Sequence, residues 1–461
     1  MEQREKAILI GADLNDNEDF INSMEELRNL AEACDIDTVS EVSQNLSRIN
    51  AQYYLGKGKI LEVSELAKDL GVDLVIFNDE LSPSQVRNLE ETVECRVIDR
   101  TVLILDIFAQ RAKTKEAQLQ VEIAKLQYML PRLIGSAEAL GRQGGGAGLK
   151  NKGSGEKKLE LDRRKLEDRI SALNKELELL VSRRQNQRKW RKKNEIPVVA
   201  LVGYTNAGKS TIMNVMIDFY NPNTEKKVFE KDMLFATLET SVRNITLSDN
   251  KNFLLTDTVG FISKLPHHLV KAFRSTLEEV AEADLLIHVI DYSNPNYKKQ
   301  MEVTQETLKE LGADQIPVIY TFNKVDLAKE YQDNADMNSM GRDDMDTDKA
   351  DGDNMDMNHI DMVNTLLNLN KELSIQDSVI ISAKKKIGMD GLISAIKKHV
   401  FADYVKLELR IPYQNGNVVS YLNDHASILS SQYENDGILI VAECKKTDYE
   451  KLKAYEAAPG L

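Results

Sequence analysis

The sequence GYTNAGKS at residues 203–210 restricts the fold of this chain more than any other stretch. It matches the pattern of a phosphate-binding loop, whose glycines let successive backbone N–H groups point at phosphate oxygens. Such a loop needs a buried strand before it and a helix whose N-terminus faces the anion after it. The apolar run at 197–203 and the stretch STIMNVMI at 210–217 supply both. We therefore predict a parallel α/β nucleotide-binding domain here.

Three further motifs follow apolar, strand-like runs in the order that a GTP site requires: DTVG at 257–260, NKVD at 323–326 and SAK at 382–384. The Asp326 carboxylate can accept hydrogen bonds from both N1–H and the exocyclic amine of guanine, a pair of donors that adenine does not offer. We expect Asn323 and Lys324 to brace this loop and cover the base. The backbone N–H of Ala383 would face the guanine O6 atom. Together the motifs predict GTP binding.

Phosphate and metal contacts are assigned within the same motifs. Lys209 is expected to reach the β- and γ-phosphates, and Ser210 to hold Mg²⁺. Thr237, in FATLET, lies between the phosphate loop and DTVG, so it is the best candidate for the mobile threonine that closes over Mg²⁺ and the γ-phosphate. We expect Ser210 and Thr237 as metal ligands, and Lys209, Thr237, Gly260 and Asn206 as catalytic residues. The residues expected to line the nucleotide are Gly203, Tyr204, Thr205, Asn206, Ala207, Gly208, Lys209, Ser210, Phe235, Ala236, Thr237, Leu238, Glu239, Asp257, Thr258, Val259, Gly260, Asn323, Lys324, Val325, Asp326, Ser382, Ala383 and Lys384.

The position after DTVG departs from the usual hydrolytic set. Ras-like switches carry Gln there to orient the attacking water, whereas this chain has Phe261. A phenyl ring cannot orient water, so we expect slow hydrolysis without a partner. Asn206 has two interpretations. It is similar to the Asn of GTPases that bind K⁺ beside the phosphates, and it also suits a residue that caps the turn.

Composition points to an ordinary globular chain of roughly three domains, since 42% of its 461 residues are hydrophobic and 29% are charged. Three scattered cysteines exclude a disulfide framework and fit a reducing compartment. No apolar run approaches the ~20 residues of a membrane span. We therefore expect a cytoplasmic protein without a membrane span.

Charge is unevenly distributed along the chain. Residues 141–194 carry seventeen Lys and Arg against seven Asp and Glu, while residues 329–361 carry three against eleven. The overall net charge of −14 therefore hides a basic segment that can meet nucleic acid. The acidic segment lacks the residues needed to bury a core, so we expect a disordered insertion at about 329–372.

The remaining patterns predict a multidomain α/β chain in four parts. Strand and helix signals alternate in 1–105, which indicates a small parallel α/β domain. Residues 106–195 are predicted to form a long antiparallel helical hairpin, because leucines repeat every seven residues from Leu159 to Leu180. Pro131 should stop or kink its first helix. Residues 196–400 form the P-loop GTPase domain, and 401–461 a small α/β appendage.

The hairpin tip, GRQGGGAGLKNKGSGE at 141–156, has two interpretations. Glycine-rich turns are usually solvated linkers. Alternatively, close backbone approach and the charges of Arg142, Lys150 and Lys152 suit contact with RNA phosphates. The basic run at 183–193, which contains Trp190, favours the second interpretation modestly.

With these motifs the chain resembles the HflX family of ribosome-associated GTPases over nearly its whole length. Beyond the GTP motifs, the stretches YYLGKGK, LSPSQVRNLE and DMLFATLETSVR and the run VIDRTVLILDIFAQRAKTKEAQLQVEIAKLQYMLPRL carry the resemblance. The glycine-rich tip differs from the family pattern, since Lys152, Ser154, Lys157 and Lys158 stand where the family usually has Arg, Pro, Thr and Gln. The acidic insertion is also unusual, so the chain is identified as a divergent member.

The resemblance implies binding to the large ribosomal subunit and its RNA in the GTP form, separation of stalled ribosomes in a stress response, and release on hydrolysis to GDP. Some members also hydrolyse ATP and are linked to RNA unwinding, so a nucleotide-driven RNA remodeller or helicase remains a rival reading. A tRNA-modifying GTPase is a third, since its phosphate loop also binds K⁺. We expect Mg²⁺ and K⁺ as ions, a monomer when free, and association with ribosomes.

Overall fold

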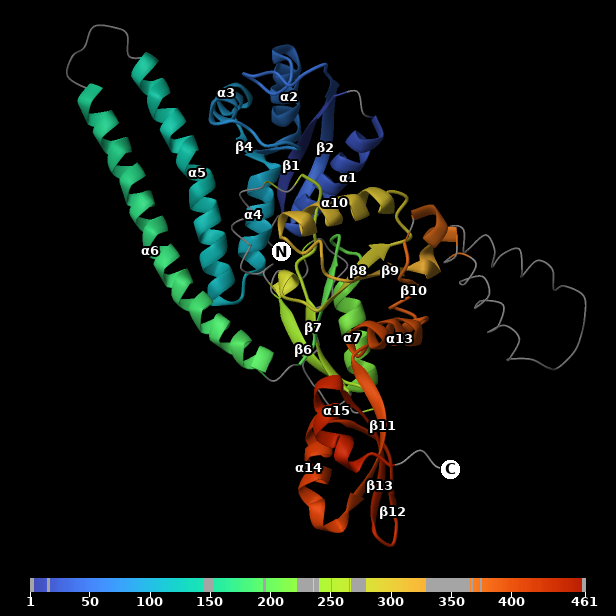
Figure 1. Ribbon diagram of the computed structural model, residues 1–461. Helices are drawn as coiled ribbons and strands as arrows, with labels where there is room; N and C mark the ends of the chain where they lie inside the picture. The colour runs from blue at the N-terminus through green and yellow to red at the C-terminus, as the bar shows by residue number, and fades with distance from the viewer. Residues whose placement is uncertain are drawn as a thin grey trace, which may run out of the picture. The chain divides into compact units, whose positions relative to one another are not determined.

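The computed structural model describes residues 4–14, 17–143, 152–193, 196–221, 235, 240–249, 251–264, 266, 279–328, 365, 368–373 and 375–457 (Figure 1). The hairpin tip at 144–151 and most of the insertion predicted at 329–372 lie outside these residues. The chain divides into two compact units. The first consists of 1–190, 231–239 and 259–277, and the second of 191–230, 240–258 and 278–461. The predicted fold class, a multidomain α/β chain, is confirmed.

The first unit begins with a four-stranded parallel sheet in the order β2-β1-β3-β4. Its strands are β1 (Glu5–Asp13), β2 (Ile36–Asn45), β3 (Leu74–Phe77) and β4 (Arg96–Asp99). Its helices are α1 (Asn17–Ala33), α2 (Lys57–Leu70), α3 (Pro83–Val93) and α4 (Arg100–Arg111). Parallel strands need such helical crossovers, which is why strand and helix signals alternate along the sequence.

The loop after β3 is fixed by the start of α3. Pro83 stands in the first turn, the Ser82 hydroxyl accepts a hydrogen bond from the Gln85 N–H at 3.3 Å, and the Gln85 side chain accepts one from the Ser82 N–H at 2.9 Å. This reciprocal capping box holds residues 78–82 at the carboxyl edge of the sheet.

A helical hairpin follows, formed by α5 (Lys115–Gln143) and α6 (Lys152–Lys193). Leu119 and Ile123 of α5 pack on Leu173 of α6. The ion pairs Lys115–Glu176 at 3.4 Å and Arg169–Glu122 at 2.8 Å show that residue numbers rise along α5 while those of the partners on α6 fall. The two helices are therefore antiparallel, as predicted. Pro131 lies inside α5, so of the two effects predicted for it, a stop or a kink, the structure excludes the stop.

The GTPase-like sheet lies in the second unit and has six strands in the order β10-β9-β8-β5-β7-β6, all parallel except β6. The strands are β5 (Val198–Gly203), β6 (Ser241–Thr246), β7 (Asn252–Asp257), β8 (Leu285–Asp291), β9 (Val318–Asn323) and β10 (Ser378–Ile380). The helices are α7 (Lys209–Tyr220), α10 (Tyr297–Glu310) and α13 (Met389–Val400). A short 3₁₀ turn covers Val325–Leu327.

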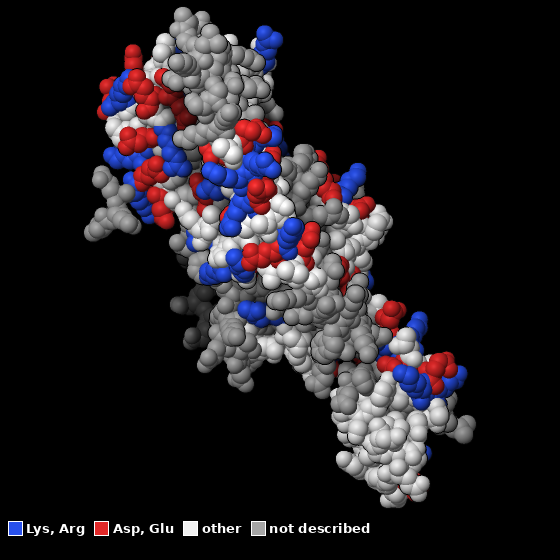
Figure 2. Space-filling view, turned by 90° about the vertical axis from the view of Figure 1, so that its left-hand side faces the viewer, with Lys and Arg blue, Asp and Glu red and all other residues white. Residues whose placement is uncertain are grey.

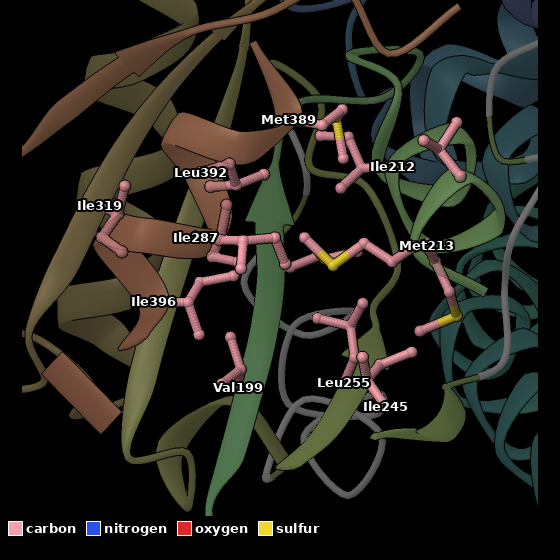
Figure 3. Close-up of a cluster of buried hydrophobic side chains, with 14 of the residues drawn as sticks. Val199, Ile212, Met213, Ile245, Leu255, Ile287, Ile319, Met389, Leu392 and Ile396 are labelled. Carbon is pink, nitrogen blue, oxygen red and sulfur yellow. The ribbon is translucent and has the colours of Figure 1, made fainter. Parts of the chain in front are cut away.

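The core of this sheet lies between its strands and helices α7 and α13 (Figure 3). Side chains from β5, β7 and β8, such as Val199, Leu255 and Ile287, meet Met213 of α7 and Leu392 of α13. Helix α10 packs through Met301 in a separate cluster with Ile290 and Phe322. Strands buried on both faces read as continuous apolar runs, which is the pattern that the sequence shows.

The C-terminal part is a three-stranded antiparallel sheet in the order β11-β13-β12. It contains β11 (Tyr404–Pro412), α14 (Gly416–His425), β12 (Ser427–Tyr433), β13 (Gly437–Lys445) and α15 (Lys446–Leu452), with 3₁₀ turns at Tyr413–Asn415 and Lys453–Tyr455. Alternate side chains of β11 are buried. Within the described ranges, no helix has the length and apolarity that crossing a bilayer requires.

His288 is a buried titratable group at the centre of the GTPase-like sheet. It lies on β8 beside Val202 of β5 and Tyr320 of β9, and 1% of its surface is exposed. Burial, and secondly the charge of Lys209, lowers its pKa from 6.5 to about 3. The folded domain therefore excludes the proton that an unfolded chain accepts near pH 6.5.

We predict that this histidine makes the sheet acid-sensitive. Because the folded pKa is depressed, His288 leaves stability unaffected well above pH 6.5 and lowers it as pH falls below that value. Between pH 7.5 and 5.5 it should remove about 1.4 kcal/mol from the free energy of unfolding. Hydrogen exchange of the β8 amides at both pH values measures this, with His288→Phe as the comparison. An equal loss of protection in His288→Phe would contradict the assignment.

Candidate functional site

The loop between β5 and α7 is built on two close approaches that only glycine allows. Gly203 has a φ of 142°, and a Cβ there would lie 2.2 Å from the Val289 carbonyl oxygen. Gly208 has a φ of 97°, and a Cβ there would lie 2.3 Å from the Asn323 side-chain nitrogen. Both conformations suit glycine alone. The loop therefore turns tightly and leads the chain into the N-terminus of α7, the end of a helix at which backbone N–H groups can donate to an anion.

Lys209 is folded back over this loop. Its Nζ donates hydrogen bonds to the carbonyl oxygens of Gly203 at 3.1 Å and Tyr204 at 2.8 Å. Only 6% of its surface is exposed, and burial lowers its pKa to about 8, a shift that the carboxylate of Asp257 opposes. A positive charge is thus held inside a loop of inward-facing backbone, which is a site for a polyanion.

Ser210 and Asp257 bring two oxygen donors together at the start of α7 and the end of β7. The Ser210 hydroxyl donates to Asp257 Oδ2 at 2.6 Å, and Asp257 is fully buried. Thr258 fixes the end of β7 by donating to the Leu201 carbonyl of β5 at 2.6 Å. A hydroxyl and a carboxylate beside a phosphate loop fit Mg²⁺, which prefers oxygen ligands and keeps several waters.

Asn323 joins the phosphate loop to the 382–384 segment. Its Nδ2 donates to the Ala207 carbonyl at 2.9 Å, and its Oδ1 accepts from the Ala383 N–H at 3.0 Å. Both ends of one buried amide are therefore used, and the two loops are held at a fixed separation. The expectation that Asn323 braces the loop agrees with these contacts.

Asp326, which the sequence predicts to bind the base, is held by two neighbours. Ser382 donates its hydroxyl to Asp326 Oδ1 at 2.7 Å, and Lys385 Nζ lies 3.9 Å from Oδ2. Lys324 has a left-handed backbone and pairs with Asp291 at 2.7 Å. Asp291 is not among the residues predicted from the sequence, although an acid at the end of the apolar run LLIHVID is the signal that could have identified it. Lys384 is exposed at the rim.

The predicted residues are not all described within one compact unit. Ala236, Thr237, Leu238 and Glu239 lie outside the described residues. Phe235 is buried, and its ring meets that of Phe108 on α4 edge-on, with centroids 4.7 Å apart. The boundary between the two compact units falls inside DTVG, after Thr258, so Val259 and Gly260 belong to the first unit.

The backbone of Asn206 and the burial of Phe261 bear on the interpretations that the sequence left open. Asn206 is exposed and has a φ of 61°, a left-handed conformation that Asn adopts more readily than most residues. Phe261 is 2% exposed, so its ring serves as packing.

Comparison with known proteins covers nearly the whole chain. Residues 21–109, 111–191 and 198–324 match three family models, described as GTP-binding GTPase N-terminal, GTP-binding GTPase Middle Region and 50S ribosome-binding GTPase. The chain is 39% identical over 452 residues to GTPase HflX of Caldanaerobacter subterraneus, covering 98% of this chain and 94% of that protein. It is 35% identical over 455 residues to GTPase HflX of Escherichia coli, covering 98% and 97%.

A GTP-binding protein from Sulfolobus solfataricus, whose crystal structure was determined with GDP, covers 86% of this chain and 99% of its own at 23% identity. The TM-score of 0.42 is too low for a comparison of the two folds.

We predict that Asp326→Asn weakens GTP binding by roughly ten- to hundredfold and improves binding of xanthosine triphosphate, because a charge-assisted pair contributes about 1.5–3 kcal/mol. Asn can still accept from Ser382, so the loop should keep its conformation. Calorimetric titration with both nucleotides measures the change, with Asp314→Asn, an exposed acid of the same unit, as the control. Unchanged GTP affinity would place the base elsewhere.

Proposed function

Because the chain belongs to the HflX family of GTPases, we propose that its GTP form binds the large ribosomal subunit and splits or rescues stalled ribosomes. Family membership identifies the chain as a hydrolase that converts GTP to GDP and phosphate. The observation that carries the proposal is the match of residues 198–324 to a 50S ribosome-binding GTPase model. Those residues include Lys209, Ser210, Asp257 and Asn323, the contacts described above. Hydrolysis would release the factor.

The chain's own residues would each make one contribution to that cycle. Lys209 and the backbone of 203–208 would bind the phosphates, Ser210 and Asp257 would hold Mg²⁺, and Asp326 would select guanine. When bound, Mg²⁺ would supply positive charge beside the phosphates. In our proposal Thr237 and the N–H of Gly260 contact the γ-phosphate. Phe261 cannot orient water, so turnover of the free protein would be slow and the ribosome would stimulate it.

The helical hairpin is the proposed contact with ribosomal RNA. The middle of α6 is not basic, since Arg163 pairs with Glu160 and Glu167, and Lys165 with Asp162. Figure 2 likewise shows Lys and Arg interleaved with Asp and Glu on the face that it draws. The excess of basic residues in 141–194 therefore belongs to the two ends of α6 and the adjoining tip. In our proposal these ends neutralise RNA phosphates.

A second function from a different class is a nucleotide-driven RNA remodeller or helicase that acts on RNA directly and uses ATP as well. It is favoured by the same basic ends of α6. The affinity for isolated RNA, compared with that for whole ribosomal subunits, separates the two functions. A remodeller would bind isolated RNA as tightly as whole subunits. We propose the ribosomal function, acting as a monomer in the cytoplasm, because the family match extends through all three models.

We predict that replacing residues 142–152 with a short neutral turn preserves GTP binding and impairs ribosome splitting. Helix α6 has 42 residues and a rise of about 1.5 Å per residue, so the tip is remote from the helix end that leads into β5. Light scattering of intact ribosomes with a GTP analogue measures splitting. Residual binding should depend less steeply on salt.

The control for this experiment is Lys165→Gln, which removes an exposed, paired charge from the middle of α6 and should split ribosomes normally. If the variant without the tip splits ribosomes as well as the parent, the tip is a linker and the proposed contact is wrong.

A bound K⁺ beside the phosphates is the second role proposed for Asn206. We predict faster GTP turnover in KCl than in NaCl, and loss of this preference in Asn206→Gly. Glycine keeps the left-handed backbone and removes only the side chain. Equal turnover in both salts would leave Asn206 with its conformational role alone.

A further inference from the structure

Helix α5 links the helical hairpin to the N-terminal domain, and the two belong to the same compact unit. On one face of α5, Leu119 and Ile123 pack on Leu173 of α6. A second face is buried where α5 lies against α3 and α4, and its residues follow helical spacing: Ala117, Val121, Ala124 and Tyr128. The direction of the hairpin therefore depends on how α5 is fixed to the domain.

Asp99 is a fully buried carboxylate at this contact, at the end of β4. Its Oδ1 accepts from the Val102 N–H at 3.0 Å, and its Oδ2 from the Leu81 N–H at 3.0 Å. The same Oδ2 accepts from the hydroxyl of Tyr128 and from the guanidinium of Arg132, each at 2.5 Å. A buried carboxylate requires such donors. Strand β4, helix α4, the loop before α3 and helix α5 thus meet at one side chain.

Tyr128 and Arg132 also hold each other. Arg132 Nη2 donates to the Tyr128 hydroxyl at 2.6 Å, and its guanidinium carbon lies 4.2 Å from the centre of the Tyr128 ring. Residues four apart share one face of a helix, so both side chains reach the carboxylate together. Burial, and secondly the charge of Asp99, raises the pKa of Tyr128, so the hydroxyl stays protonated and keeps donating at neutral pH.

Pro131 makes α5 weaker at the same place. A proline inside a helix has no N–H for the carbonyl four residues earlier, and helices bend at such points. Tyr128 and Arg132 stand on either side of Pro131 and bind the same fixed carboxylate. Beyond them α5 continues as an arm, residues 133–143. From Arg132 to Gln143 a helix rises by about 16 Å, so a change of ~15° in direction would move its end by ~4 Å.

We propose that Asp99, Tyr128 and Arg132 are positioning residues for the hairpin tip: they fix the direction in which α5 leaves the N-terminal domain. An arm that is already oriented binds more tightly than a swinging arm with the same contacts, because less conformational freedom is lost on binding. This inference rests on the proposed contact between the tip and ribosomal RNA. It gives the three residues no contact of their own with RNA.

Two variants release the arm to different extents. Tyr128→Phe removes one hydroxyl and keeps the buried ring, so it should fold even if Arg132→Gln, which removes a charge beside a buried carboxylate, does not. Lys125→Gln is the matched control. Lys125 lies on the same helix before Pro131 and pairs with Asp106 of α4 at 2.7 Å, but its side chain is 43% exposed, so the loss of this pair should have little effect.

The first measurement needs no ribosomes. Nitroxide labels are placed at Asp69 of α2 and at Gln143, the last residue of α5, in the full chain with its three native cysteines replaced. Double electron–electron resonance gives the distribution of distances between them. We expect it to broaden by ~4 Å in Tyr128→Phe and Arg132→Gln, and to keep the parent width in Lys125→Gln. The parent width in both arm variants would overturn the proposal.

The second measurement is ribosome splitting, titrated with each variant in the presence of a GTP analogue. The protein concentration at half-maximal splitting should rise roughly three- to tenfold in Tyr128→Phe and Arg132→Gln, since the freed arm must be ordered on binding. GTP affinity and the salt dependence of ribosome binding should keep their parent values, because the phosphate contacts of the tip remain. A shallower salt dependence in Arg132→Gln would mean that Arg132 itself meets RNA, which contradicts the proposal.

The proposed positioning and the proposed ribosomal function fail separately. If the parent protein does not split ribosomes, the ribosomal function is wrong, and the distance measurement still decides whether the three residues fix the arm. If the parent splits ribosomes and both arm variants do so at the parent concentration, the positioning role is wrong and the ribosomal function stands.

Discussion

One buried amide joins two loops of the candidate nucleotide site. Asn323 donates from its nitrogen to the Ala207 carbonyl and accepts with its oxygen from the Ala383 N–H, so the 203–208 loop and the 382–384 segment are held together by a single side chain. The amide fits only because Gly208 has no Cβ to displace it. Sequence motifs 116 residues apart are thus one structural element, and Lys209, Ser210 and Asp326 take their positions from it.

The N-terminal domain has a comparable centre in Arg100. Burying a guanidinium is unfavourable unless its donors find acceptors, and Asn78, Ser23, Glu26 and Ser263 supply four to its two terminal nitrogens. Its Nε is buried without an acceptor among the described residues. Two of these acceptors, of Ser23 and Ser263, are backbone carbonyls. The hydrogen bonds of Arg100 therefore depend on the path of the backbone as well as on side chains. The buried charge of Arg100 therefore favours one segment of the chain at the sheet edge over others. Such a buried charge contributes more to the specificity of the fold than to its stability.

Local sequence signals predicted most of the fold. Contacts between residues remote in sequence could not be predicted from such signals. The glycines of the P-loop are themselves the signal for its tight turn. The alternation of strand and helix signals predicted the N-terminal domain. Strand β12, with the sequence SILSSQY, was missed because a polar edge strand lacks an apolar run. Arg100 was not identified because its partners Glu26 and Ser263 are 74 and 163 residues away. The stretch before DTVG indicated β7, but nothing local showed that Phe261 would be buried.

The division of the chain has a consequence for synthesis. The first unit takes residues 231–239 and 259–277 from inside the sequence of the second, so the chain passes between the units five times. The ring of Phe108, which is 2% exposed, packs against that of Phe235. Arg100 donates to the Ser263 carbonyl. During synthesis, residues 1–190 of the first unit therefore emerge before Phe235 and Ser263 exist, and Arg100 meets the Ser263 carbonyl only after 73 further residues have been added. A fragment that ends with α6 would lack the same partners. The first unit is therefore not a contiguous, separable module, because part of it is encoded within the sequence of the second unit.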